Sequence, residues 1–321
     1  MIAIVPSAAY STLATLVQIV LVVLLGPLLI GFMAKVRARA EGRVGAPINQ
    51  PLRDLRKLLS KERLHARHAS VVLPFAPMVI LAATSVAVAI SPLVTTHPLL
   101  GSSADILVIV YLLLTGSVAA ALAGLDAGTA FGGMGASRAM TIGALAEPAL
   151  LVAVIALSIQ SGTSNLPSMI STTLTHPNWV SGPSRLLALV ALVIVVIAET
   201  GRLPVDNPST HLELTMIHEA MILEYAGPEL ALVTLGASMR LGLLFSLIAN
   251  LFFPWGIATS GSILGLLLGV AALVAKTALV AFGVSLIEIR SAKLRLFRLP
   301  ELLAGGFVLS VLAVITGLVT R

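Results

Sequence analysis

One thirty-residue stretch, 199–228, gathers more side chains that could take up and release protons than any other stretch of this length in the chain. It places five carboxylates, one arginine and two histidines between two long apolar runs, although only 11% of the 321 residues are charged. Carboxylates that lie close together raise one another's pKa, so some of them would share protons near neutral pH. We therefore expect this stretch to transfer protons or to dock a partner.

Three further ionisable residues lie inside apolar runs. Glu147 is followed by Pro148 within the run 141–161, about six residues after its start. A carboxylate in a membrane span is costly, and a role in proton relay is the default hypothesis. Arg240 and Lys276 lie near the middle of later runs and should face a polar interior or a partner subunit. A buried lysine titrates readily, so Lys276 is either a relay element or the structural partner of an acid.

These considerations define the candidate site. The expected relay members are Glu147, Glu199, Asp206, Glu213, Glu219, Glu224 and Lys276, and the expected charge partners are Arg138, Arg202 and Arg240.

The composition indicates an all-α polytopic membrane protein. Hydrophobic residues make up 58% of the chain, and the charged fraction is far below the roughly 25% of a soluble domain. Cysteine is absent, which excludes disulfides and thiolate ligation of zinc or iron–sulfur clusters within this chain. His218-Glu219 begins like the zinc motif H-E-x-x-H, but position 222 is Ile. We expect no cofactor or metal here, so any redox centre belongs to a partner.

About eight apolar runs are long enough to cross a bilayer as helices. They are residues 10–33, 71–94, 104–124, 141–161, 184–200, 229–253, 262–288 and 301–320. Sixteen of the twenty Lys and Arg residues lie in or beside alternate loops. By the positive-inside rule, loops 34–70, 125–140, 201–228 and 289–300 are cytoplasmic, and both termini lie outside. We expect one membrane domain over 1–321 in the cell (inner) membrane, and no nucleic-acid partner despite the net charge of +6.

The first cytoplasmic loop predicts a short amphipathic helix. Pro51 suits a helix start, and Leu52, Leu55, Leu58 and Leu59 then share one face. Such a helix could rest on lipid or form a docking surface, and the interspersed acids favour docking. The expected docking residues are Arg43, Gln50, Asp54, Lys57, Lys61 and Glu62.

The loop after the third span contains glycines at four-residue spacing, namely Gly124, Gly128 and Gly132. Small residues at this spacing let helices approach closely. A phosphate-binding loop is excluded, because no Gly-Lys-Ser/Thr follows.

Several of these segments resemble one family. They are Gly42-Arg43-x-Gly45, Gln50-Pro51-x-x-Asp54-x-x-Lys57-Leu58-x-x-Lys61-Glu62, Ser137-Arg138-Ala139-Met140, Glu147, Ala198-Glu199-Thr200-Gly201-Arg202-x-Pro204-x-Asp206, Glu213-Leu214 and Glu224-Tyr225. The chain resembles the membrane subunit, called H or subunit 1, that joins the two arms of respiratory complex I and its hydrogenase relatives. His218-Glu219-Ala220-Met221 and the segments 250–256 and 292–303 are similar to the branch in energy-converting nickel–iron hydrogenases and formate hydrogenlyases.

The resemblance implies a non-catalytic anchor and coupling subunit. It implies a hydrogenase-like large subunit, an iron–sulfur small subunit and antiporter-like membrane subunits as partners, with a nickel–iron centre and iron–sulfur clusters in those partners. The acids would then link electron transfer to proton or sodium movement. A quinone-binding subunit of an NADH:quinone oxidoreductase is the alternative, and a quinone between the first span and the amphipathic helix would support it. A free-standing transporter would require inverted repeats, and the sequence shows none.

Overall fold

The computed structural model describes residues 8–64, 66, 69–176, 179–180, 182–206 and 216–319. Within these ranges the regular structure is helical. The α-helices are α1 (Ala8–Ala40), α2 (Gln50–Leu59), α3 (Val72–Ile90), α4 (Ile106–Asp126), α5 (Ala130–Ser161), α6 (Leu166–Thr175), α7 (Pro183–Glu199), α8 (His218–Met221), α9 (Gly227–Phe252), α10 (Ile263–Arg290) and α11 (Leu299–Val319). Two short 3₁₀ turns, η1 (Gly101–Ser103) and η3 (Leu296–Arg298), precede α4 and α11.

A helix is present at each predicted span, which confirms the all-α polytopic fold. Seven of these helices are at least 18 residues long and apolar enough to cross a membrane. The eighth, α7, has 17 residues, close to the lower limit of about 17 for a spanning helix.

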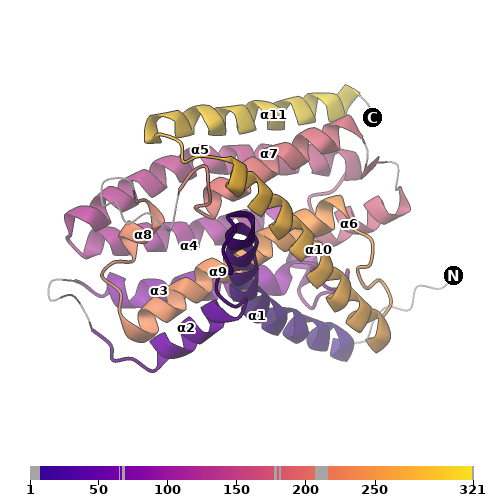
Figure 1. The fold of residues 1–321 in the computed structure, drawn as a ribbon. Helices are drawn as coiled ribbons and strands as arrows, with labels where there is room; N and C mark the ends of the chain where they lie inside the picture. Colours follow the sequence, from indigo (N-terminus) through magenta and orange to yellow (C-terminus); the bar gives the residue numbers. More distant parts are fainter. Residues whose placement is uncertain are drawn as a thin grey trace.

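Long helices cross at small residues. Gly26 of α1 lies against the backbone of Ser238 in α9. A Cβ atom placed on Gly242 of α9 would lie 3.4 Å from the Cα atom of Gly26. The helices pack in three groups, namely α1 with α9, α5 with α7 and α11, and α3 with α4 and α9. Because α9 belongs to two of these groups, it runs through the centre of the bundle (Figure 1). Small residues at such crossings are typical of helix packing in membranes.

The predicted loop at 125–140 is mostly helix, which corrects the expectation. Only residues 127–129 separate α4 from α5, and the Thr129 side chain caps α5 by accepting from the Gly132 N–H at 3.3 Å. The glycines here have low helix propensity, but they allow Gly132 to pack on the Gly124 carbonyl. The predicted packing role is confirmed for Gly124 and Gly132, whereas Gly128, with φ of 65°, has nothing within 4 Å of a Cβ placed on it and serves the turn instead. Because α5 begins at Ala130, Glu147 lies near its middle rather than near its start.

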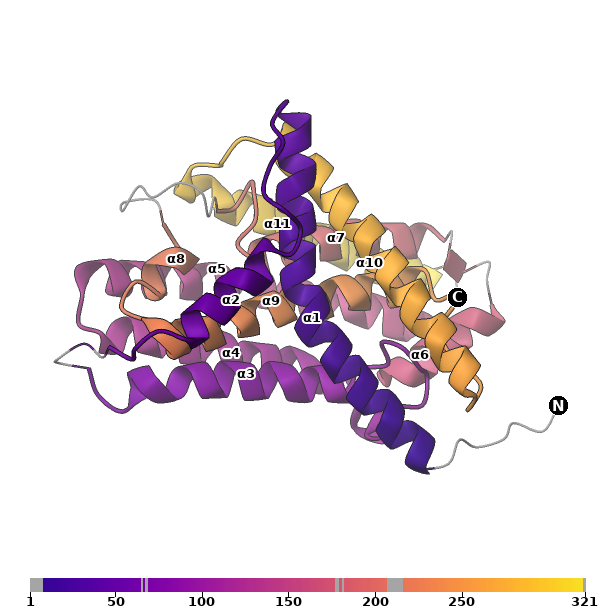
Figure 2. The same cartoon turned by 60° about the horizontal axis from the view of Figure 1, so that its bottom comes forward.

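The amphipathic helix is confirmed as α2, with a proline in its first turn. Its Leu55 is buried, Leu52 and Leu58 are half-buried, and α2 packs against α1 and α9 (Figure 2). The leucine face therefore contacts protein, and the charged face stays exposed.

The helix expected after Asn207-Pro208 lies largely outside the described residues. Its described part is the single turn α8, so the expected continuation through Glu224 is wrong. Gly227, with φ of 58°, and Pro228 begin α9, which forces the chain to turn over residues 222–226. The helix α6, in the segment after α5, was not expected; Asn165 caps it by accepting from Ser168 N–H at 3.2 Å.

The bundle has two distinct ends. The start of α1 and the end of α11 lie at the end that also holds α6, whereas α2 and α8 lie at the other end (Figures 1 and 2). We call the latter the basic face, because α1 and α10 end there with Arg37, Arg39 and Arg290. We call the end that holds α6 the opposite face.

Candidate functional site

The turn that follows α7, residues 199–206, contributes one charged side chain to each of three ion pairs. Glu199 pairs with Arg240, Arg202 pairs with Glu288, and Asp206 pairs with Lys293. Their partners come from α9, from the end of α10 and from the segment after α10. One turn thus connects elements that are far apart in sequence.

The Glu199–Arg240 pair connects side chains of three helices. The two side chains are 9% and 17% exposed, and Arg240 Nη1 also donates to the Ser117 hydroxyl of α4 at 2.5 Å. A buried charge is tolerated when it is paired and hydrogen-bonded. This pair therefore joins α4, α7 and α9 through one guanidinium.

Glu147 adds a second carboxylate to this pair. It is half-buried on α5 and interacts electrostatically with both Glu199 and Arg240. The Glu147 carboxylate lies over the preceding turn of α5, where a Cβ on Gly143 would be in van der Waals contact with Oε1 at 3.7 Å. Glu147 and Glu199 therefore lie near the same guanidinium, that of Arg240.

Asp206 is the most strongly held acid of the turn. Lys293 Nζ donates to its Oδ1 at 3.0 Å, and the His218 backbone N–H donates to Oδ2 at 3.3 Å. Burial by itself would raise the pKa of the Asp206 carboxyl, but hydrogen bonds and charge from His218 and Lys293 outweigh it and lower the pKa to about 2. Asp206 is therefore an anion that fixes the turn, rather than a group that exchanges protons near neutral pH.

The Arg202–Glu288 pair is also buried, with Nη1 and Oε1 3.5 Å apart. Burial lowers the pKa of the Arg202 guanidinium, while Glu288 acts in the opposite direction. Arg37 of α1 interacts electrostatically with both residues.

Gly201 allows the turn to approach α8. Its φ is 59°, in the left-handed region, and a Cβ there would lie 2.6 Å from His218 Nδ1. A side chain would strain the backbone and displace the histidine. The contact with α8 thus requires glycine at position 201.

The other expected relay residues, and the expected charge partner Arg138, are not members of these three ion pairs. Glu219 is half-buried on α8, and Glu224 is half-buried in the turn that follows. Arg138 Nη1 donates to the Met216 carbonyl at 3.1 Å. Lys276 Nζ donates to Asn250 Oδ1 at 2.6 Å and to the Phe253 carbonyl at 3.1 Å, toward the opposite face. Glu213 lies outside the described residues.

Three residues of the site were missed in the sequence. In the sequence, Glu288 lies at the end of a predicted span and Lys293 lies in a basic loop. Ser117 is an ordinary residue of an apolar run. Their partners are 86, 87 and 123 residues away along the chain. No local spacing signals such contacts.

The expected docking residues form an exposed surface on the basic face. Gln50 Nε2 donates to Asp54 Oδ1 at 2.9 Å, and Arg43 pairs with Glu41. Lys57, Lys61 and Glu62 are exposed, so their charges are available to a partner.

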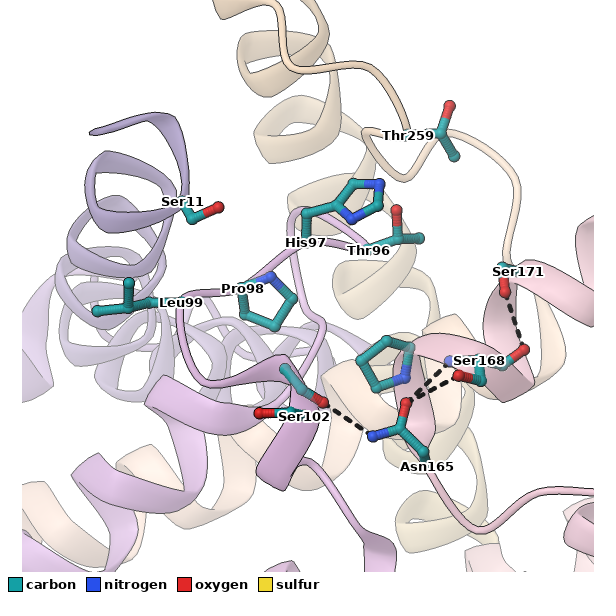
Figure 3. A pocket seen from close by; sticks show the side chains of 12 residues that line it. Ser11, Thr96, His97, Pro98, Leu99, Ser102, Asn165, Ser168, Ser171 and Thr259 are labelled. Carbon is teal, nitrogen blue, oxygen red and sulfur yellow. Dashed lines mark hydrogen bonds between the residues drawn. The ribbon is translucent and has the colours of Figure 1, made fainter. Parts of the chain in front are cut away.

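The opposite face carries a separate polar pocket of about 530 Å³ (Figure 3). Its walls come from the start of α1, the segment 96–102, the start of α6 and Thr259. Ser11, His97 and Ser168 are among the lining side chains, and no carboxylate or arginine lines it. The pocket contains none of the expected relay residues. Within the described ranges, no three His, Asp or Glu side chains gather as a metal site would require.

The fold and its buried ion pairs define a polytopic membrane protein with a charged network at one end. The chain belongs to the NADH dehydrogenase family, whose model matches residues 12–319. It is 32% identical over 305 residues to hydrogenase-4 component C of Escherichia coli (strain K12), covering 95% of each chain. It is 29% identical over 306 residues to formate hydrogenlyase subunit 4 of the same strain, covering 95% of this chain and 98% of the other.

A solved structure has the same fold. A chain in the structure of the membrane-bound sulfane sulfur reductase, an archaeal respiratory membrane complex, matches with a TM-score of 0.81 at 21% identity. The match covers 95% of this chain and 98% of that one. These comparisons confirm the family resemblance found in the sequence.

Proposed function

We propose that this chain is the membrane-anchor and coupling subunit of a hydrogenase- or formate hydrogenlyase-type complex related to complex I. It docks a peripheral redox arm and links electron transfer to proton or sodium movement. The observation that carries the proposal is the turn 199–206, which supplies one member to each of three ion pairs. The similarity to hydrogenase-4 component C and formate hydrogenlyase subunit 4 supports this branch.

In this proposal the turn converts a movement at the basic face into a change of charge within the bundle. Asp206 is held by Lys293, and Arg202 by Glu288, so a partner that shifts the turn also shifts Glu199. When Arg240 moves away from Glu199, the carboxylates of Glu199 and Glu147 lose their shared counter-charge. One of them then takes up a proton, and return of the turn releases it.

The remaining assignments follow from this role. The basic face is cytoplasmic, both termini lie outside, and the membrane is the cell (inner) membrane. The partners are a hydrogenase-like large subunit and an iron–sulfur small subunit, which carry the nickel–iron centre and the iron–sulfur clusters, together with antiporter-like membrane subunits.

The test is the substitution Glu147→Gln in the whole complex, in sealed membrane vesicles. The amide keeps the volume of the side chain but cannot exchange a proton. We expect ion movement per electron transferred to fall by about a hundredfold, the scale of removing a positioned proton-transfer group. Electron transfer from artificial donors to the peripheral enzyme should be retained.

Glu301→Gln is the matched control, because Glu301 is exposed in the first turn of α11. It should pump normally. Normal pumping in Glu147→Gln as well would show that this carboxylate is structural, and the coupling role of the site would be rejected.

A further inference from the structure

A cleft of about 500 Å³ lies between the ends of α1 and α10 on the basic face. These two helices lie side by side in both ribbon views (Figures 1 and 2). Arg37, Arg43, Glu41 and Glu288 line the cleft, and small residues such as Ala34 and Gly45 leave it open. Glu288 is also the partner of Arg202, so the cleft lies beside the turn 199–206.

Around the cleft, one arginine has no carboxylate of its own among the described ion pairs. Glu41 pairs with Arg43, and Glu288 pairs with Arg202 directly behind the wall. Arg37 interacts electrostatically with Glu288 and Arg202, but the described residues offer it no hydrogen bond. Three arginines thus face two glutamates. A guanidinium presents a planar set of donors that fits the oxygens of a phosphate, so the cleft is suited to an anion.

An apolar stripe leads away from the cleft into the membrane-spanning part of α10. Leu279, Phe282 and Leu286 follow one another at helical spacing and are 70%, 44% and 44% exposed. The stripe approaches Ile289 and Ser291, which line the cleft. A cationic cleft above an exposed apolar helix face matches a phosphate bonded to acyl chains.

We propose that this cleft binds the head group of an anionic phospholipid, with its phosphate on Arg37 and Arg43 and its acyl chains along α10. Basic pockets between spanning helices at the membrane surface are known to hold such head groups. An acidic protein segment or free phosphate would share the anionic chemistry, but neither would use the apolar stripe.

The test uses the purified full chain in detergent. Native mass spectrometry counts lipid retained after titration with phosphatidylglycerol, with phosphatidylcholine, or with inorganic phosphate in competition. We expect phosphatidylglycerol to be retained and phosphatidylcholine lost. Substituting Arg37→Gln and Arg43→Gln together should weaken retention about thirtyfold, from the contribution of two basic residues at an anionic surface.

The double substitution Arg53→Gln and Arg56→Gln is the matched control. Both residues are exposed on α2, and replacing them removes the same amount of charge from the same face. It should retain phosphatidylglycerol as the unmodified chain does. If the double variant in the cleft unfolds, Arg37→Gln alone should still weaken retention.

Three outcomes would overturn the proposal. One is equal retention by the cleft variants and the control. Another is displacement of the lipid by millimolar inorganic phosphate, which would indicate a free-anion site. The third is complete loss of the lipid from the intact complex, which would show that an acidic partner occupies the cleft.

Discussion

At the scale of residues, the buried charges fall into two kinds. Asp206 and Arg202 each have a counter-charge of their own, so their charge is fixed. Glu147 and Glu199 share Arg240, so one positive charge serves two carboxylates. A charged group in a membrane span is expensive unless it has a partner. In the proposed coupling role, protonation therefore changes at the carboxylates beside Arg240, and the fixed pairs anchor the turn.

Asp206→Asn should destabilise the chain in a pH-dependent way. The carboxyl has a pKa of about 2 in the folded state, below the roughly 3.9 of an unfolded chain. A lowered pKa contributes stability above about pH 4, and this contribution is lost as the pH falls toward 2. We expect the substitution to lower the free energy of unfolding by about 2 kcal/mol at pH 7, with the difference shrinking below pH 4.

Denaturation in detergent at pH 7, 5 and 3 would measure the effect. Asp54→Asn is the control, because Asp54 is exposed and has no salt bridge among the described residues. A pH-independent loss in Asp206→Asn would show that the carboxylate acts through shape rather than charge.

At the scale of elements, the sequence predicts what is local and misses what is distant. About 20 consecutive apolar residues are sufficient to define a spanning helix, which is why each predicted span is found as a helix. The start of α5 was hidden because Gly132, Gly133 and Gly135 have low helix propensity, and packing on Gly124 overrides it. The partner of Arg202 could not be predicted, because no periodicity links it to Glu288.

The helix α2 is the element on which docking can be tested. Leu52, Leu55 and Leu58 lie on the side packed against α1 and α9, whereas Leu59 is 57% exposed, so the exposed charges of α2 are free to contact a peripheral subunit. Replacing Asp54 with Asn and Lys57 with Gln should release the peripheral subunits during purification of the complex, while the membrane chain still accumulates. Both changes are on the exposed face, so the stability of the bundle should change by less than about 0.5 kcal/mol.

Arg298→Gln with Glu301→Gln removes the same pair of charges from the start of α11, where both side chains are exposed. This control should keep the peripheral subunits. Full retention by the α2 variant would mean that the docking surface lies elsewhere on the basic face.

At the scale of the whole molecule, charge is distributed by face. The basic face carries α2 and the ends of α1 and α10 (Figure 1), together with the Arg202–Glu288 and Asp206–Lys293 pairs, whereas the opposite face has a polar pocket lined by no arginine or carboxylate (Figure 3). A membrane protein with this asymmetry has its basic loops in the cytoplasm. We predict that the chain crosses the membrane eight times, which would place both termini on the outer side.

The absence of cysteine gives this topology a clean test. Ser60 follows α2 on the basic face and Ser260 lies before α10 on the opposite face, and both are exposed. In intact cells, a membrane-impermeant thiol reagent should label Ser260→Cys and leave Ser60→Cys unlabelled. Permeabilised cells should label both, which controls for reactivity. The reverse pattern would place the basic face outside, where a peripheral redox arm in the cytoplasm could not reach α2 or the turn 199–206, and both the docking and the coupling roles would fail together.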